Sequence, residues 1–348
     1  AAPALCCLFQ EGDFAMVTTG RALEFGVLLH TADLTGDHVA HPDLAPLWEQ
    51  TTLVEELGYD HVWIGDSSRI EIAWPRADCL TIMTAMAMKT TRLRIGTVPL
   101  SVPLRNPVLL AHALATADVI SNGRLIIGAA IGKGGDEGLR EFQASGVPNN
   151  ERGARLTESL DLMRRLWTED SVNFQGKYYS TPPDMGIRPR PIQRPIPTFV
   201  AAGAEPALVR AGRFGDGWFT MARDPQQFSD LRRKVDGYAR EAGREGQADR
   251  SAMYATFHLD KDGERARRNA DGHLDAYFGA HHRSGAAAGY FGSPEEIAER
   301  LQEMVDRGLT TMVARVIGSD FEQQSKLLLD DMLPRLTARP LGTRVAPA

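Results

Sequence analysis

The stretch DHVWIGDSSR, residues 60–69, changes character abruptly along its length. Apolar and small residues fill positions 62–65, and the polar residues Asp66, Ser67, Ser68 and Arg69 follow directly. A strand with one face in water alternates along its length, whereas a strand buried on both faces is apolar throughout. The pattern therefore predicts a buried parallel strand that carries polar groups at its carboxyl end.

Seven further apolar runs of this kind lie along the chain, separated by segments with helical periodicity. The eight predicted strands cover residues 23–30, 61–65, 93–100, 123–132, 198–203, 216–222, 252–259 and 310–318. Strands that alternate with helices form a parallel sheet through crossover connections. A doubly wound sheet would carry a phosphate fingerprint after its first strand, and this chain has none there. We therefore expect an α/β fold, a (β/α)8 TIM barrel with insertions.

The barrel is predicted to span residues 24–337 as a single domain, with its extra length at 133–150, 174–197 and 259–292. Residues 1–23 lack both periodicity and the cationic start of a signal peptide, so we expect a loosely ordered extension there. The tail at 338–348 is expected to be frayed.

The composition excludes several classes of function. The 348 residues carry a net charge of -6 with an isoelectric point near 5.9, so no basic surface indicates nucleic acid or anionic membranes as partners. No apolar run approaches the roughly 18 residues that span a bilayer. Cys6, Cys7 and Cys79 form neither a disulfide framework nor a metal-type spacing, and no metal site is expected. These features favour a cytoplasmic, bacterial enzyme that acts on a small molecule.

The reacting groups of a barrel of this type lie at the carboxyl ends of its strands. Asp66 and Ser67 end the second predicted strand, and His30 ends the first. His258 lies at the end of the seventh strand and Arg315 in the eighth, where they are candidates to line a substrate pocket. A pair such as Asp66 and Ser67 is equally typical of a helix N-cap, and spacing alone does not separate the two interpretations.

The turn GAAIGKGGDEGL, residues 128–139, lies between a predicted strand and a helix start. Its exposed backbone amides resemble those that hold a phosphate group. The spacing matches neither a P-loop nor a dinucleotide fingerprint, so a flexible surface turn is the alternative. The residues concerned are Gly132, Lys133, Gly134 and Gly135.

A second turn with small residues, Ala202 and Gly203, follows the fifth strand, and two such turns at one rim favour phosphate binding. At the end of the third strand, Pro99 leaves both peptide forms accessible, because the cis form of an X–Pro bond costs only about 0.5–1 kcal/mol. Trp74, Trp218 and Tyr290 are candidates to line a pocket for a flat ring, although such aromatic residues also occur in cores.

Several segments in order along the chain resemble the luciferase-like family of flavin- and deazaflavin-dependent oxidoreductases, from about residue 24 to 335. The resemblance is carried by LGYDHVWIGDS (57–67), TTRLRIGTVPL (90–100), RNPVLLAHALATADVISNGRLIIGAAIGKG (105–134), ERGARLTESLDLMRRLWTEDSVNFQGKYYS (151–180), RPRPIQRPIPTFVAAG (188–203), AGRFGDGWF (211–219) and YFGSPEEIAERL (290–301).

The resemblance implies a cofactor, either coenzyme F420 or FMN, held across the carboxyl end of the barrel. Its ring would lie near Asp66, Ser67 and Val98–Pro99, on a bulge that often contains a cis peptide bond in this family. Its phosphate would lie at Gly132–Gly135 and Ala202–Gly203. The glycine-rich turn and the segments after it look nearer to the deazaflavin-associated branch, so F420 is favoured over FMN.

Several members of the family carry a catalytic histidine directly after the acid that matches Asp66, whereas this chain has Ser67. Serine is a poor general base at neutral pH, so that role does not carry over. His30 is the first candidate to replace it, with His258 or the substrate as alternatives.

The cofactor would decide the reaction: F420 implies hydride transfer, and FMN implies monooxygenation, with a separate flavin reductase as a possible partner. A homodimer is the default expectation for this family. The alternatives to a redox enzyme are a barrel hydrolase or lyase without redox cofactor and a non-catalytic flavin-binding relative.

Overall fold

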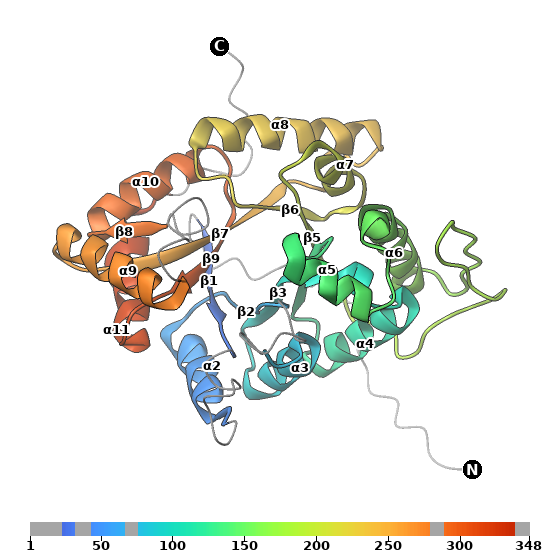
Figure 1. The fold of residues 1–348 in the computed structure, drawn as a ribbon, viewed down its shortest axis with the longest axis horizontal. Helices are drawn as coiled ribbons and strands as arrows, with labels where there is room; N and C mark the ends of the chain where they lie inside the picture. The colour runs from blue at the N-terminus through green and yellow to red at the C-terminus, as the bar shows by residue number, and fades with distance from the viewer. Residues whose placement is uncertain (1–22, 32–42, 67–75, 279–288, 338–348) are drawn as a thin grey trace, which may run out of the picture.

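Eight parallel strands close into a barrel in the computed structural model, which describes residues 23–31, 43–66, 76–278 and 289–337 (Figure 1). Neighbouring strands pair in parallel, and the pairing of β6 with β7 closes the ring. The eight-stranded barrel predicted from the sequence is therefore confirmed. Its strands are β1 (Glu24–Leu29), β2 (His61–Ile64), β3 (Arg94–Ser101), β4 (Leu125–Ala130), β5 (Thr198–Ala201), β6 (Gly217–Thr220), β7 (Arg250–Leu259) and β9 (Thr311–Val316).

A further short strand, β8 (Tyr290–Gly292), was not predicted. It pairs with the carboxyl end of β7, where Phe257 faces Tyr290, and lies outside the closed ring. Three residues are too few to show a strand periodicity, which explains why the sequence pattern missed this element.

Helices cover the outside of the barrel and bury their apolar faces against the outer faces of the strands (Figure 1). Several begin with a side-chain cap, such as Asn106 before α4 and the capping box of Ser293 and Glu296 before α10. These helices are α2 (Ala45–Leu57), α3 (Cys79–Lys89), α4 (Pro107–Ile120), α6 (Arg152–Thr168), α7 (Glu205–Phe214), α8 (Pro225–Glu241), α10 (Pro294–Asp306) and α11 (Phe321–Lys326), with short helical turns η1 (Val102–Leu104), η2 (Asn149–Glu151), η4 (Leu327–Met332) and η5 (Leu333–Arg335). No helix within the described ranges is long and apolar enough to cross a membrane.

The inside of the barrel is filled by one apolar layer to which every barrel strand contributes a residue. Because side chains alternate between the two faces of a strand, this layer defines which residues of each strand point inward. The layer consists of Leu28, Trp63, Val98, Ile126, Phe199, Phe219, Ala252 and Val313. It separates the two ends of the barrel, so a ligand can enter only beyond one of its ends.

The amino end of the barrel is closed by a buried polar cluster. Arg94 and Arg250 both pair with Glu24, and the hydroxyl of Thr311 donates to the same carboxylate. Above this cluster, the indole of Trp63 donates to Nδ1 of His61 at 2.5 Å. Charged groups that satisfy one another in this way fill this end of the lumen.

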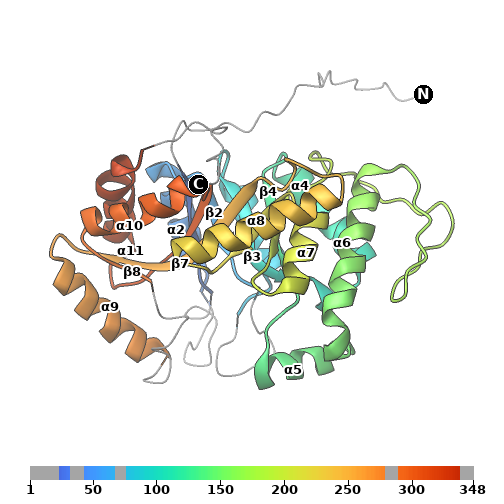
Figure 2. The same cartoon turned by 90° about the horizontal axis from the view of Figure 1, so that it is seen from above.

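Two of the three predicted insertions follow strands at the carboxyl end of the barrel. Helix α5 (Gly135–Ala144) follows β4, and α9 (Gly263–Phe278) follows β7. Figure 2 shows both helices on the same side of the barrel.

The remaining predicted insertion, residues 174–197, is part of the segment 169–197 that leads from α6 to β5, and isolated bridges fold this segment back on itself. Glu158 of α6 fixes it by accepting hydrogen bonds from the backbone amides of Lys177, Tyr178 and Tyr179 at 2.7–3.2 Å. A carboxylate that accepts several backbone amides is a strong local anchor.

Substitution of Gly96 tests how tightly the barrel interior is packed. A Cβ atom at this position would lie 2.1 Å from a ring carbon of Trp63, so Gly96→Ala should lower the free energy of unfolding by about 2–3 kcal/mol. In the control Gly237→Ala, on α8, the new methyl group meets nothing within 4 Å, and stability should rise by up to about 1 kcal/mol. Urea unfolding of both variants measures the difference, and equal stabilities would contradict the packing.

Candidate active site at the carboxyl end of the barrel

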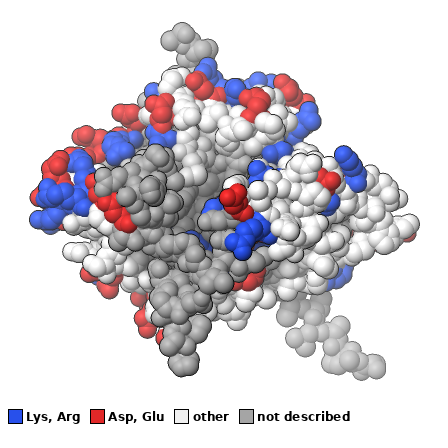
Figure 3. Space-filling model, in the orientation of Figure 1, with Lys and Arg blue, Asp and Glu red and all other residues white. Residues whose placement is uncertain are grey.

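The predicted site residues at the strand ends gather at one end of the barrel, because all its strands run in parallel. His30 follows β1, Asp66 follows β2, Pro99 lies near the end of β3, and Lys133 and Gly203 follow β4 and β5. Figure 3 looks onto this face and shows a hollow over the centre of the barrel. The polar residues at the strand ends therefore lie at one end of the barrel, as the sequence interpretation requires.

Asp66 is buried, with 5% of its surface exposed, and its carboxylate is fully engaged. Arg105 donates to both oxygens, at 2.8 Å to Oδ2 and 3.0 Å to Oδ1, and the backbone amide of Ser101 donates to Oδ2 at 2.9 Å. Bonds to this carboxylate raise the pKa of Arg105 above its usual value even though burial opposes the charge. The pair joins the end of β2 to the turn after β3.

This geometry gives Asp66 a positioning role. Asp66 does not cap α3, because Asp78 does so by accepting from the amide of Thr81 at 2.9 Å. Burial also raises the pKa of the neighbouring Cys79 thiol, so that thiol is inert. The predicted partner in chemistry, Ser67, lies outside the described residues, and a reacting role for Asp66 stays a prediction.

The end of β3 contains the expected bulge. The register with β4 shifts between Thr97 and Leu100, so Val98 and Pro99 together oppose the single residue Gly128. A side chain at Gly128 would meet the Thr97 carbonyl oxygen at 2.2 Å, which explains the glycine. The Val98–Pro99 bond, for which the sequence left both forms open, is trans, and the cis bonds of the described chain are Arg188–Pro189 and Arg194–Pro195. The bulge alone turns Pro99 to an exposed position at the rim.

His30 lies between two guanidinium groups. Its Nδ1 is 3.5 Å from Nη1 of Arg76, and Arg315 adds a second positive charge nearby. The pKa of His30 is lowered from 6.5 to about 3, mainly by burial and further by the two arginines. The imidazole is therefore neutral near pH 7. A guanidinium can only donate, so Nδ1 accepts and the single proton of the neutral ring lies on Nε2. Nε2 is buried and has no hydrogen-bond partner in the described part of the chain.

His258 has the opposite arrangement. It is 7% exposed, and its Nδ1 lies 2.8 Å from the carbonyl oxygen of Ile317. A carbonyl oxygen only accepts, so Nδ1 carries the proton and Nε2 of the neutral ring holds a lone pair. Of these two histidines, His258 rather than His30 has the outer nitrogen that can accept a proton. The ranking of His30 first as a base is therefore not supported by this geometry.

The glycine-rich turn after β4 opens at the amino end of α5. Gly132 and Gly135 have φ of 87° and 75°, which few other residues adopt. Gly134 is the N-cap residue of α5 and supplies no side chain, so the first amides of the helix have no side-chain cap. A Cβ atom at Gly134 or Gly135 would meet nothing within 4 Å, so the space above these amides is open. The exposed Lys133 adjoins them, and its carbonyl oxygen accepts from Arg152.

The neighbouring turn after β5 is only partly available. The amide of Ala202 donates to Phe219 and its carbonyl oxygen accepts from the indole of Trp218, so the backbone of Ala202 is used within the fold. Gly203 is exposed, and a Cβ atom there would again meet nothing within 4 Å. Because β4 and β5 are adjacent strands, Gly203 and the α5 turn lie at the same part of the rim.

Two of the predicted aromatic residues lie in the core instead of the site. Tyr290 is 2% exposed and stacks on Phe257 with ring centroids 5.0 Å apart. Trp218 is fully buried against Phe228. Their apolar rings fill the space between strands and helices, so we leave both out of the site. Trp74 lies outside the described residues.

Two functional candidates were missed by sequence reasoning, namely Arg105 and Arg76. The only available signal for Arg105 was a cation between the third strand and the helix N-cap at Asn106. Arg76 has no signal, because its approach to His30 depends on how the chain crosses the barrel end. Among the residues that the structure describes, no group of side chains could hold a metal ion.

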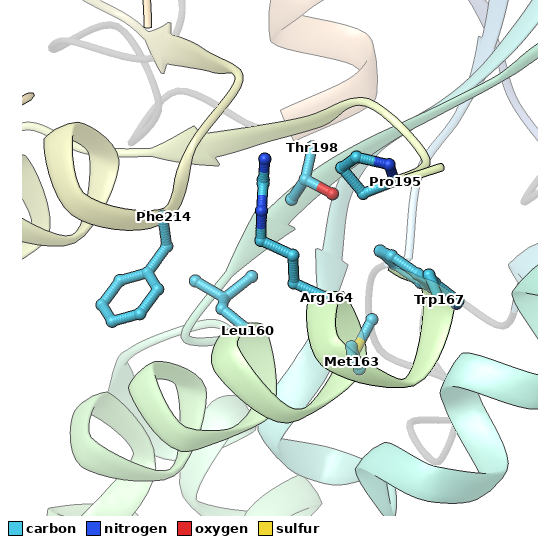
Figure 4. A pocket seen from close by; sticks show the side chains of 7 residues that line it. All are labelled: Leu160, Met163, Arg164, Trp167, Pro195, Thr198 and Phe214. Carbon is cyan, nitrogen blue, oxygen red and sulfur yellow. The ribbon is translucent and has the colours of Figure 1, made fainter. Parts of the chain in front are cut away.

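A small separate pocket lies between α6 and α7, and it is lined by Leu160, Met163, Arg164, Trp167, Pro195, Thr198 and Phe214 (Figure 4). Thr198 is the first residue of β5, so this pocket lies at the amino end of the barrel. Its one charged group, Arg164, is paired with Asp216 at 2.9 Å. The residues that line this pocket therefore do not indicate a catalytic site.

Comparison with known proteins places the fold and site in a class. The family model described as luciferase-like monooxygenase matches residues 23–290. The chain is 31% identical over 323 residues to an F420-dependent glucose-6-phosphate dehydrogenase of Amycolatopsis mediterranei, covering 84% of this chain and 94% of that one. In structure it is similar to the coenzyme F420 dependent tetrahydromethanopterin reductase of Methanopyrus kandleri, with a TM-score of 0.72 and 22% identity over 90% of this chain and 99% of that one.

A monooxygenase from Streptomyces bottropensis has the same fold, with a TM-score of 0.74 and 24% identity over 90% of this chain and 99% of that chain. The chain therefore belongs to the luciferase-like monooxygenase family. It is an oxidoreductase of that class, and a flavin-type cofactor accompanies the class.

The role of Asp66 can be tested by stability. Asp66→Asn leaves the largely buried guanidinium of Arg105 with the exposed Asp78 carboxylate, 3.5 Å away, as its remaining ionic partner, so the free energy of unfolding should fall by about 2–3 kcal/mol. The double variant Asp66→Asn, Arg105→Gln should recover part of that loss, because no unpaired charge remains. Unchanged stability of Asp66→Asn together with lost turnover would instead identify a reacting carboxylate.

The low pKa of His30 predicts a dependence of stability on pH. The unfolded histidine binds a proton near pH 6.5 and the folded one near pH 3, so the contribution is complete above pH 6.5 and lost as pH falls below it. Wild-type protein should lose at most about 2 kcal/mol through His30 between pH 7 and pH 5, and His30→Gln should lose correspondingly less. Urea unfolding at both pH values measures this, and identical losses in the two proteins would be evidence against the buried neutral ring.

Proposed function

We propose that this chain is an F420-dependent oxidoreductase that transfers a hydride between the deazaflavin and a small organic substrate. The supporting observation is the similarity to F420-dependent glucose-6-phosphate dehydrogenases over most of both chains, including one from Kineococcus radiotolerans at 32% identity over 317 residues.

The residues at the rim fit a cofactor that carries a phosphate group. The uncapped amides at Gly134 and Gly135 begin a helix of ten residues, and a helix amino end favours an anion. The open space at Gly203 on the adjacent turn leaves room for the same group. These residues would hold the phosphate end, and the exposed Pro99 on the bulge would support the ring.

The cofactor, when bound, supplies the exchange of a hydride with the substrate. The apolar layer of Leu28, Trp63 and Val98 closes the barrel below the site and excludes water from that side. Asp66 and Arg105 hold the ends of β2 and β3 together. The lone pair on Nε2 of His258 suits it to take up a proton, whereas His30 presents an N–H group.

The proposal departs from family members with a histidine after the acid. Ser67 occupies that position here, so the proton transfer would depend on a residue elsewhere at the rim. His258 is the residue that we propose for it, on the strength of its hydrogen bond to Ile317. His258→Gln should then lower turnover without weakening cofactor binding.

The direct test is an anaerobic titration of the purified protein with reduced F420 and, separately, with reduced FMN, followed by absorbance and tryptophan fluorescence. We expect saturable binding of F420 that is stronger than that of FMN. Preference for FMN would reverse the cofactor assignment and indicate monooxygenation. Saturable binding of neither cofactor would overturn the proposed function.

Gly134→Val tests the phosphate turn. The φ of Gly134 is -92°, which any residue adopts, and a Cβ atom there meets nothing within 4 Å, so the melting temperature should change little. The side chain would occupy the space over the α5 amides and should weaken F420 binding about tenfold or more. Ser145→Val, at the other end of α5, is the matched control. Equal affinities in both variants would remove the turn from the cofactor site.

A further inference from the structure

The outer faces of α3 and α4 expose large apolar side chains to solvent. Seven such side chains are exposed in the described part of the chain, and four of them belong to these two helices: Met88, Leu109, Val119 and Ile120. Met88 and Leu109 are 71% and 70% exposed, so they contribute little to the core of this chain. A fifth, Ile192, lies just beyond the end of α4, because a Cβ atom on Gly123 would be 3.1 Å from its side chain.

The solvent-facing residues of both helices recur every three or four positions, so they form one row on each helix. On α4 the row is Leu109, His112, Ala113, Thr116, Val119 and Ile120, and on α3 it is Thr81, Thr84, Ala85 and Met88. The two helices pack side by side on the barrel (Figure 1), so their rows combine into one surface, which we call the α3–α4 face. A contiguous apolar surface of this kind marks a place that another molecule covers.

The α3–α4 face is also unusual in its lack of charge. Among the described residues of α3 and α4, the only Asp, Glu, Lys or Arg residues are Lys89, at the last position of α3, and Asp118. Asp118 is fully buried and accepts from the amide and the side chain of Gln193 at 2.9 and 2.8 Å. Helix α8, in contrast, carries surface ion pairs such as Arg232–Asp236. Figure 3 shows charged side chains gathered along the edge formed by α8, α9 and α10.

Several polar groups of the face already have partners within the chain. The hydroxyls of Thr84 and Thr116 donate to carbonyl oxygens one turn earlier in their own helices, at 2.8 and 2.9 Å. Nε2 of His112 donates to the carbonyl oxygen of Arg188 at 2.9 Å. Covering the face would leave these donors bonded, so it would remove apolar surface from water without breaking their hydrogen bonds.

We propose that the α3–α4 face is the interface of a symmetric homodimer, in which it packs against the same face of a second copy of this chain. Residues near the two-fold axis of such a dimer face their own copies, so a charge there would repel itself. A face whose only exposed charge lies at its end avoids that repulsion and is complementary to itself.

Other occupants fit the α3–α4 face less well. Charged groups at an interface select one partner protein from others, and this face offers almost none. A helix that lies on an anionic membrane carries several basic side chains beside its apolar face, whereas α3 and α4 together carry Lys89 alone. The surface therefore favours a second copy.

Analytical ultracentrifugation of the full chain without cofactor tests the proposal. We expect the mass of two chains, each of 38.1 kDa, at micromolar concentration. The double variant Leu109→Glu, Val119→Glu would bury carboxylates against their own copies, so the dissociation constant should rise about a hundredfold or more. Both side chains are exposed in the single chain, so the variant should fold, which circular dichroism checks.

Leu139→Glu is the control, because Leu139 is an equally apolar, exposed residue on α5, beyond the carboxyl end of the barrel (Figure 2). It should leave the dissociation constant unchanged. The melting temperature gives a second measurement, because dimerisation couples it to protein concentration. It should rise with concentration in the wild type and the control, and stay constant in the double variant over the range in which that variant is monomeric.

A wild-type chain that stays monomeric at about 100 μM would overturn the proposal, and residues 1–22 of the same chain would become the next candidate to cover the face. A dimer of unchanged affinity in the double variant would place the interface elsewhere and overturn the proposal as well. Neither measurement involves F420, so both outcomes are independent of the proposed function.

Discussion

The interior of the barrel is filled from its amino end, and this constraint determines where chemistry can occur. Glu24 is bonded to two arginines and a threonine, and Trp63 and His61 occupy the space that glycines leave above them. One apolar residue from each barrel strand then completes the seal. Only the opposite end has room for a cofactor and a substrate, so the polar ends of the strands become the working surface of the protein.

The strands and the closed ring could be predicted because a strand that is buried on both faces is apolar along its whole length. The glycine turn at residues 132–135 was also readable, since positive φ angles require that residue type. Contacts between residues at the ends of different strands could not be predicted from the sequence. Asp66 and Arg105 are 39 positions apart, and nothing in the spacing of either residue reports their contact.

The residues that the sequence analysis assigned to the wrong place show the same limit of prediction. Tyr290 lies in a strand of three residues, too short to reveal that its ring faces the helices. The bulge at Val98 and Pro99 was predicted correctly, yet the sequence leaves both forms of the bond between them open, because the two forms of an X–Pro bond differ little in free energy. Two histidines that look alike in sequence also acquire opposite hydrogen-bonding roles. An arginine faces one of them and a backbone carbonyl faces the other.

The excursion between α6 and β5 has a consequence for how this protein tolerates change. Glu158 holds its turn through three backbone amides, and Arg155 of the same helix lies over the rings of Tyr178 and Tyr179, so the turn is attached to α6. The segment also enters the barrel at the amino end, the sealed side. Lengthening or diversifying it would alter the outer surface while leaving the reaction chamber untouched, which makes it a natural place for new recognition surfaces to arise.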